Sequence, residues 1–169
     1  MRVRASLPEL KSFLDPRWRE LLAPALPLLD ILERDIDFAR SVPQKDQIFK
    51  AFECEPHEVV VVIFGQDPYP TLGHAHGLAF SVDGSVTKLP PSLRNIFEEL
   101  SIDTGKPKRE MGDLSDWSNQ GVLLLNRILT TEVGSSMVHQ SLGWQTITEL
   151  VAAELGSRDV VAILWGKPA

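Results

Sequence analysis

The chain has 169 residues, of which 43% are hydrophobic and 24% charged, and its formal net charge at pH 7 is −6. This size and composition suit one soluble globular domain. The acidic balance disfavours a protein that holds nucleic acid through bulk electrostatic attraction, so any contact with DNA must rest on a few local groups. No apolar run reaches membrane-spanning length and the N-terminus has no hydrophobic signal core, so we expect a cytoplasmic protein that contacts no membrane. The single Cys54 cannot form an internal disulfide, which fits a reducing compartment.

The N-terminal third of the chain carries helical patterns. Apolar residues at helical spacing follow Pro27, a residue type favoured at a helix start. Pro43 is expected to open a further helix that has Phe49 and Phe52 on one face. This part of the sequence therefore predicts helices that cover the rest of the domain.

Strand and helix patterns alternate after that point. Six consecutive apolar residues, mostly β-branched, occupy positions 59–64 and predict a strand covered on both faces, as in a parallel sheet. Helical patterns follow at 93–100, 114–120 and 143–155, and further strand patterns at 122–126 and 159–165. This order indicates an α/β fold of three layers, in which a central, mostly parallel sheet is flanked by helices. Because no repeat, low-complexity tract or linker interrupts it, residues 1–169 are expected to form a single domain.

Polar residues follow the ends of all three predicted strands. The first strand leads into Gly65-Gln66-Asp67, the second ends at Asn126, and the third at Gly166-Lys167. Because ligands bind outside the carboxyl ends of parallel strands, we expect these groups to converge on one rim. Asp67 leaves an apolar strand, where an unpaired charge is costly, and prolines on both sides of Tyr69 restrict the backbone. Taken alone, residues 65–70 suit a rigid strand-to-loop turn as well as a binding site.

Six sequence blocks, in order and at consistent spacing, favour the site. They are Gly65-Gln66-Asp67-Pro68-Tyr69, Ala75-His76-Gly77-Leu78-Ala79-Phe80-Ser81-Val82, Pro90-Pro91-Ser92-Leu93, Gly121-Val122-Leu123-Leu124-Leu125-Asn126, Ser141-Leu142-Gly143-Trp144 and Leu164-Trp165-Gly166. Together they resemble family 1 uracil-DNA glycosylase, from about residue 43 to the last residue. The resemblance implies an enzyme of base excision repair that flips uracil out of single- or double-stranded DNA and hydrolyses its N-glycosidic bond. It further implies a monomer with a four-stranded type of sheet and neither cofactor nor metal.

The resemblance assigns catalysis and base recognition to the residues at the ends of the first two predicted strands. Asp67 would be the catalytic acid, which orients the attacking water and faces the positive charge that develops on the sugar. Gln66 would bind a uracil carbonyl through its backbone, with no role for its side chain. The Asn126 amide would accept from N3–H and donate to O4 of uracil, whereas cytosine presents the opposite pattern at that edge. Without the family, Asn126 would be read as a turn former.

Two aromatic residues would enclose the base. Tyr69, the sole tyrosine, would pack against C5 of the pyrimidine, so that a thymine methyl group would overlap its ring. Phe80 would stack on the extruded base, a contact worth about 1–3 kcal/mol at comparable sites. The alternatives are a Tyr69 that only walls the core and a Phe80 within a core strand over 78–82. Pro70 stands where many relatives have His, which removes one polar group from the rim.

Two turns would contact the DNA backbone. Pro91 and Ser92 resemble a phosphate-binding loop at a helix start, although Ser92 would serve equally as an ordinary N-cap. Gly166 and Lys167 resemble a second such turn. No phosphate-cradling glycine loop or nucleophile elbow supports the rival reading of a generic α/β hydrolase or nucleotide-binding domain.

The spacing of two histidines, His74 and His76, is compatible with a metal site. No cysteine or spaced carboxylate set completes such a site. The resemblance explains His76 and His139 as structural polar residues, so we expect no metal.

The resemblance also exposes a difference at the C-terminal end. Relatives continue into a strand, a helix and a His-Pro-Ser-Pro-Leu motif, and no histidine of this chain lies in such a context. The expectation is a chain truncated before that motif. The alternative to an active enzyme is therefore an inactive or weakly active remnant that retains at most binding of DNA or uracil.

Overall fold

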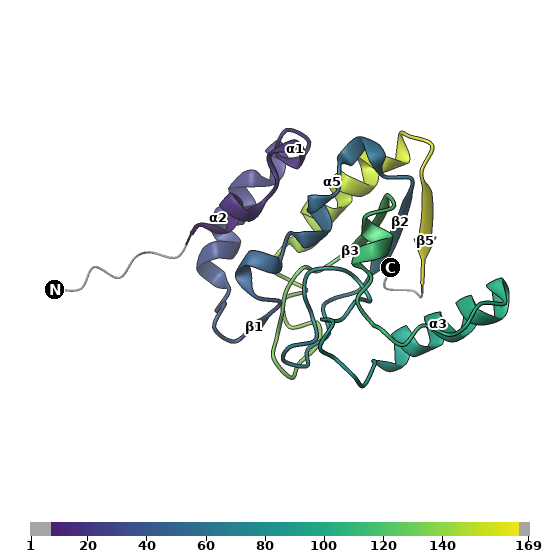
Figure 1. Cartoon of the computed structure of the whole chain (residues 1–169). Helices are drawn as coiled ribbons and strands as arrows, with labels where there is room; N and C mark the ends of the chain where they lie inside the picture. The colour runs from purple at the N-terminus through teal and green to yellow at the C-terminus, as the bar shows by residue number, and fades with distance from the viewer. Residues whose placement is uncertain (1–7, 166–169) are drawn as a thin grey trace.

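The computed structural model describes residues 8–165 and is built around a parallel sheet of three strands. The strands are β2 (Val61–Gly65), β3 (Val122–Asn126) and β5 (Val161–Leu164), and β2 lies between the other two (Figure 1). Four of the five residues of both β2 and β3 are buried, as expected for strands covered on both faces. This confirms the predicted α/β fold.

Two helical connections cover the sheet. Helix α3 (Pro91–Thr104) and the short α4 (Ser115–Ser118) lie between β2 and β3 in the chain, and α5 (Trp144–Gly156) lies between β3 and β5. The first crossover runs from β2 to β3, and the second runs back past β2 to β5. Because they run in opposite directions, right-handed connections place their helices on opposite faces of the sheet. Figure 1 shows α3 and α5 on opposite sides of the strands, which makes the three predicted layers.

The N-terminal part is helical but less regular than predicted. Helix α2 (Leu26–Asp35) has Pro27 in its first turn, as expected. The helix predicted after Pro43 is wrong: short 3-10 turns take its place, and they bury Ile48, Phe49, Ala51 and Phe52 in the core. The remaining short elements are η1 (Leu10–Phe13), α1 (Pro16–Arg19), η2 (Ala23–Ala25), η3 (Lys45–Gln47), η4 (Lys50–Glu53), η5 (Pro56–Glu58) and the antiparallel pair β1 (Ser41–Val42) and β4 (Thr131–Glu132).

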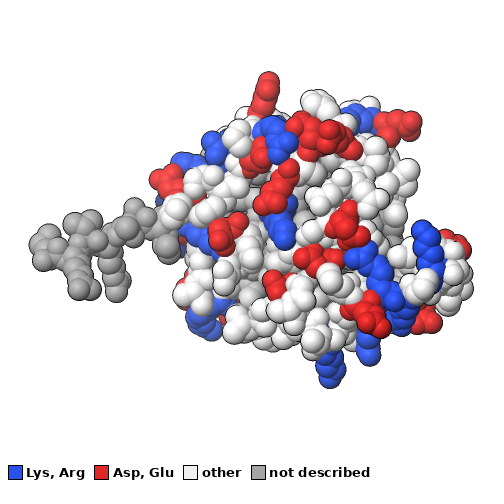
Figure 2. Space-filling model, viewed as in Figure 1, with Lys and Arg blue, Asp and Glu red and all other residues white. Residues whose placement is uncertain are grey.

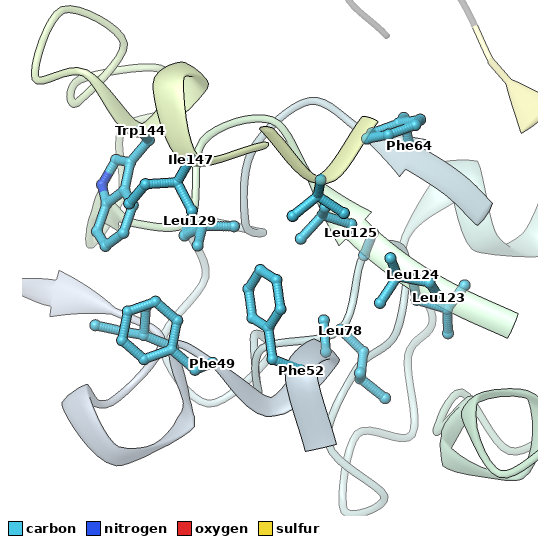
Figure 3. Packing of buried hydrophobic residues seen from close by; sticks show 14 of the residues in the cluster. Phe49, Phe52, Phe64, Leu78, Leu123, Leu124, Leu125, Leu129, Trp144 and Ile147 are labelled. Atoms are coloured by element: carbon cyan, nitrogen blue, oxygen red, sulfur yellow. The ribbon is translucent and has the colours of Figure 1, made fainter. Parts of the chain in front are cut away.

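One hydrophobic core joins these helices to the sheet. Trp18 stacks edge-on against Phe52 with ring centroids 5.1 Å apart, and Phe49 does the same against Trp144 at 6.2 Å. Figure 3 shows Phe49, Phe52 and Trp144 gathered with the leucines of β3. The Trp144 indole donates to Thr130 Oγ1 at 2.8 Å, so its polar group is satisfied within the core. The loops that carry the strand ends are thus held by continuous packing.

The third strand is shorter and more exposed than the other two. The sequence predicted a strand over 159–165, and β5 covers its central four residues. It lies at an edge of the sheet, with Val161 61% and Leu164 59% exposed. Gly166 and Lys167 lie outside the described residues. Within residues 8–165, no helix has both the length and the apolar character needed to cross a membrane.

Candidate functional site

The parallel register of β2 and β3 brings two predicted site residues to the same rim. Gly65 is paired with Asn126 across the sheet. The pairing continues into the loops, because Arg127 N donates to the Gly65 carbonyl at 2.9 Å and Ile128 N to the Gln66 carbonyl at 3.0 Å. Asp67 therefore leaves β2 beside the end of β3, as expected from the topology.

Gly65 leaves the space that the Asn126 side chain occupies. A Cβ atom at Gly65 would lie 2.1 Å from Asn126 Oδ1 and 3.0 Å from the Cβ of Ala79. The Asn126 side chain is therefore seated directly against the backbone of β2, and the residue is 8% exposed. Sequence reasoning did not identify this role, since it depends on which residue faces Gly65 on the neighbouring strand.

The Asp67 carboxylate is oriented through both of its oxygens. Gln66 Nε2 donates to Oδ1 at 3.0 Å, and the backbone N–H of Met137 donates to Oδ2 at 2.7 Å. Met137 adopts a left-handed backbone with φ 63°, a conformation that non-glycine residues rarely hold without a surrounding constraint. The Gln66 side chain thus has a role where the sequence suggested none. Met137 has no counterpart among the predicted site residues, because its contribution is a backbone group brought from another loop.

Tyr69 is hydrogen-bonded to two other predicted site residues, Phe80 and Ser92. Its hydroxyl donates to the Phe80 carbonyl at 3.2 Å and lies 2.7 Å from Ser92 Oγ. Since the phenol has one proton, the Ser92 hydroxyl is the donor in the second contact. Burial raises the pKa of Tyr69, which keeps the phenol protonated near neutral pH. The ring also packs partly against the core, so the site and core readings of Tyr69 are compatible.

Phe80 lies in a loop and not in the strand that the apolar pattern over 78–82 suggested. It has a left-handed backbone with φ 64°, which interrupts an extended chain. The N–H of Ala79 donates to the Leu124 carbonyl of β3 at 3.0 Å, so the loop is fastened to the sheet just before Phe80. The half-buried Phe80 ring meets Trp165 edge-on, with centroids 5.2 Å apart.

The segment predicted to contact phosphates forms the exposed start of α3. Pro91 is the first residue of the helix and Ser92 the second, and both are exposed. The N-cap alternative for Ser92 is wrong, because Pro90 occupies that position and the Ser92 hydroxyl bonds Tyr69 instead. Figure 2 shows basic and acidic side chains interspersed over the visible face, in keeping with a net charge of −6.

Other candidate chemical groups are occupied or unreactive. Lys50 Nζ lies 2.8 Å from His76 Nδ1, and Ser81 Oγ lies 2.6 Å from His76 Nε2. His139 Nδ1 lies 2.8 Å from Thr130 Oγ1. Burial raises the pKa of the Cys54 thiol to about 11, so the residue is a poor nucleophile. Over residues 8–165, no group of three or more His, Cys, Asp or Glu side chains is arranged to hold a metal ion.

Comparison with known proteins gives a consistent result. Residues 52–169 match the family described as the Uracil DNA glycosylase superfamily. The chain is 44% identical over 162 residues to the uracil-DNA glycosylase of Corynebacterium efficiens, covering 91% of this chain and 68% of that protein. It is 42% identical over 167 residues to that of Mycobacteroides abscessus, covering 95% of this chain and 74% of that protein.

A solved structure supports the same relationship. The crystal structure of mimivirus uracil-DNA glycosylase superposes with a TM-score of 0.84 at 28% identity, covering 94% of this chain and 63% of the viral one. The chain therefore spans less than two thirds of the mimivirus protein.

Proposed function

Because the chain belongs to the uracil DNA glycosylase superfamily, we propose that it is a family 1 uracil-DNA glycosylase, which extrudes uracil from DNA and hydrolyses its N-glycosidic bond. The observation that carries the proposal is the Asp67 carboxylate, oriented through both oxygens beside the buried amide of Asn126. A fixed acid next to a fixed hydrogen-bonding edge suits cleavage at a recognised base. The reaction would initiate base excision repair.

In the proposed reaction, Asp67 acts on the sugar side of the bond. The C1′–N1 bond breaks with its electron pair leaving on uracil N1, and the sugar acquires oxocarbenium character. The carboxylate faces this charge and orients a water molecule, whose oxygen bonds to C1′ while its proton passes to Asp67. Gln66 and Met137 hold the carboxylate in place beforehand, so little reorganisation is needed during the reaction.

Base recognition would rest on three side chains and one backbone group. The Asn126 amide accepts from N3–H and donates to O4, which selects uracil over cytosine. Tyr69 excludes the methyl group of thymine, Phe80 stacks on the base, and the Gln66 backbone binds a carbonyl. The hydrogen bond from Tyr69 to the Phe80 carbonyl, 3.2 Å long, supports the view that these two rings form one pocket.

DNA would be held by local backbone contacts. Exposed Pro91 and Ser92 at the start of α3 suit a phosphate, because the first backbone N–H groups of a helix have no partner within the helix and attract anions. Gly166 and Lys167 remain predicted contacts. We infer that single- and double-stranded DNA are both substrates, and that neither a metal nor a cofactor is used.

We also propose that the chain acts as a single domain, as a monomer and in the cytoplasm. The continuous core from Trp18 to Trp144 supports the first of these. Sedimentation equilibrium of the purified chain would test the second, and a mass near twice 18.8 kDa would contradict it.

The test measures the free base released from oligonucleotides with one deoxyuridine, deoxycytidine or thymidine at a defined position. The parent chain should release uracil only. Asn126→Asp should shift release toward cytosine, and Tyr69→Ala should gain some release of thymine. An unchanged preference for uracil in Asn126→Asp would remove that residue from the specificity role. Binding of uracil-containing DNA without release by the parent chain would instead favour the alternative of a remnant that binds but does not cleave.

A further inference from the structure

A polar cluster lies next to Phe80 in the structure and has no part in the proposed chemistry. Its members are Lys50 on η4, His76 and Ser81. His76 is 3% exposed and Ser81 1% exposed. Buried polar groups that are fully hydrogen-bonded fix a local arrangement, whereas the loss of one partner leaves a costly unsatisfied group.

The distances determine where the protons lie. The Lys50 ammonium is only a donor, so its contact of 2.8 Å requires a lone pair on His76 Nδ1. The imidazole is then neutral and donates from Nε2 to Ser81 Oγ at 2.6 Å. Ser81 Oγ also accepts from the backbone N–H of Leu114 at 2.9 Å, so its own proton is directed to the Gly112 carbonyl at 3.4 Å. Every polar atom of the cluster has a partner.

The cluster fixes the residue that follows Phe80. Phe80 has a left-handed backbone, a conformation that costs a non-glycine residue free energy and persists only where its surroundings impose it. On its N-terminal side, Ala79 N is fastened to Leu124 of β3. On its C-terminal side, the constraint is Ser81, whose hydroxyl makes the three contacts described above.

We propose that His76 is a positioning residue, which acts through Ser81 to hold the Phe80 ring in the orientation that stacks on the extruded base. This rests on the proposed function, in which Phe80 stacks on uracil. His76 touches neither the base nor the sugar in this scheme. Its contribution is to orient the base platform before DNA binds.

The charges around His76 agree with this role. Burial and, secondly, the Lys50 ammonium lower the pKa of His76, while the more distant carboxylates of Asp113 and Asp83 act in the opposite direction. A proton on Nδ1 would place an N–H against the Lys50 ammonium and break the arrangement. The neutral tautomer that the geometry requires is therefore the form held at neutral pH.

A double-mutant cycle between His76 and Phe80 tests the inference. His76→Leu removes both hydrogen bonds, and Phe80→Ala removes the platform. We expect each to weaken the affinity for free uracil, measured by calorimetry, and to raise KM for a deoxyuridine oligonucleotide roughly 5- to 150-fold, the range for loss of one stacked base. The double variant should be no weaker than Phe80→Ala, because His76 acts only through Phe80. In all three, kcat should change much less than KM.

Milder variants keep the test informative if His76→Leu fails to fold. His76→Gln retains a donor for Ser81 and should restore most of the affinity, and Ser81→Ala should resemble His76→Leu. His57→Gln, at an exposed position, is the matched control and should behave as the parent. Multiplicative losses in the double variant, or equal losses from Gln and Leu at His76, would overturn the inference. If Phe80→Ala alone left both KM and uracil affinity unchanged, the stacking role itself would fail and the inference with it.

Discussion

The two strands that pair with the central strand β2 differ in how deeply their side chains are buried. On one side, Leu123, Leu124 and Leu125 of β3 are all at most 1% exposed. On the other, Val161 and Leu164 of β5 are about three fifths exposed, although the backbone pairing with β2 is regular. Hydrogen bonding alone thus does not distinguish the two strands, and side-chain packing does.

The proposed chemistry is concentrated on the well-packed side. Asn126 ends β3, Asp67 follows β2, and the Phe80 loop is fastened to β3 through Leu124. Rigid packing suits groups that must be placed within a fraction of an ångström before the substrate arrives. The β5 side contributes mainly through its backbone pairing. Substitutions on the two sides should therefore have different consequences.

The largest effect on stability should come from a cavity in the core at β3. Leu124→Ala removes a fully buried side chain and should lower the free energy of unfolding by about 2–5 kcal/mol. Leu164→Ala on β5 removes a mostly exposed side chain and should stay within about 0.5 kcal/mol of the parent. Chemical denaturation of both variants would measure the difference. Equal losses would break the comparison between the two strands.

A smaller effect, confined to the site, should follow from Gly65→Ala. The added Cβ would meet Asn126 Oδ1 at 2.1 Å and must displace that side chain. We expect kcat/KM for uracil release to fall at least about tenfold, which corresponds to roughly 1.4 kcal/mol of transition-state stabilisation. Gly84→Ala, where a Cβ meets nothing within 4 Å, is the matched control. Full activity of Gly65→Ala would show that the seat of Asn126 is unimportant.

The smallest effect should be a pH dependence of stability that arises on the β2–β3 side. Burial lowers the pKa of both His76 and His139 below the ordinary value of 6.5. Below about pH 6.5 the unfolded chain therefore binds more protons than the folded one, and the free energy of unfolding falls as the pH falls. Above that pH the contribution of both histidines is complete. Denaturant titrations at several pH values should show this direction.

His76→Gln should reduce the pH dependence of stability, because one of the two titrating groups is removed. His57→Gln, at an exposed position, is the matched control. The carboxylates near the two histidines, Asp83 and Asp113 for His76 and Glu132 for His139, oppose the shifts but do not reverse them. A pH dependence as strong in His76→Gln as in the parent would assign the effect to other groups.

The sequence predicted the elements whose pattern is local. The apolar runs at 59–64 and 122–126 correspond to the strands β2 and β3, and their parallel order correctly predicted that Asp67 lies beside the end of the neighbouring strand, at Asn126. Periodicity failed where tertiary packing overrides the local pattern. That is the case for the turns around Phe49 and Phe52, and for the loop over 78–82, where the apolar pattern suggested a strand and Phe80 adopts a left-handed backbone.

The parts of the site that the sequence could not predict are contacts between distant segments. The Met137 N–H reaches Asp67 across 70 positions in the chain. The fit of Asn126 against Gly65 depends on strand register, and the Tyr69 hydroxyl meets Ser92 only because α3 begins beside the loop after β2. The identity of a residue does not indicate whether its backbone N–H will donate to a distant side chain, as at Met137, or whether its neighbour will fill the space beside it, as at Gly65. These contacts also hold the site residues in place, so they are the ones most worth changing experimentally.

The most direct test of the central claim is the rate of uracil release by Asp67→Asn from a single-stranded deoxyuridine oligonucleotide. The change keeps the side-chain shape and removes the charge, so kcat should fall at least about 10²-fold while free uracil still binds. Asp103→Asn, on the exposed end of α3, is the matched control and should retain the parental rate. A rate for Asp67→Asn within about threefold of the parent, which is less than 1 kcal/mol of barrier, would contradict the assignment of Asp67 as the catalytic acid.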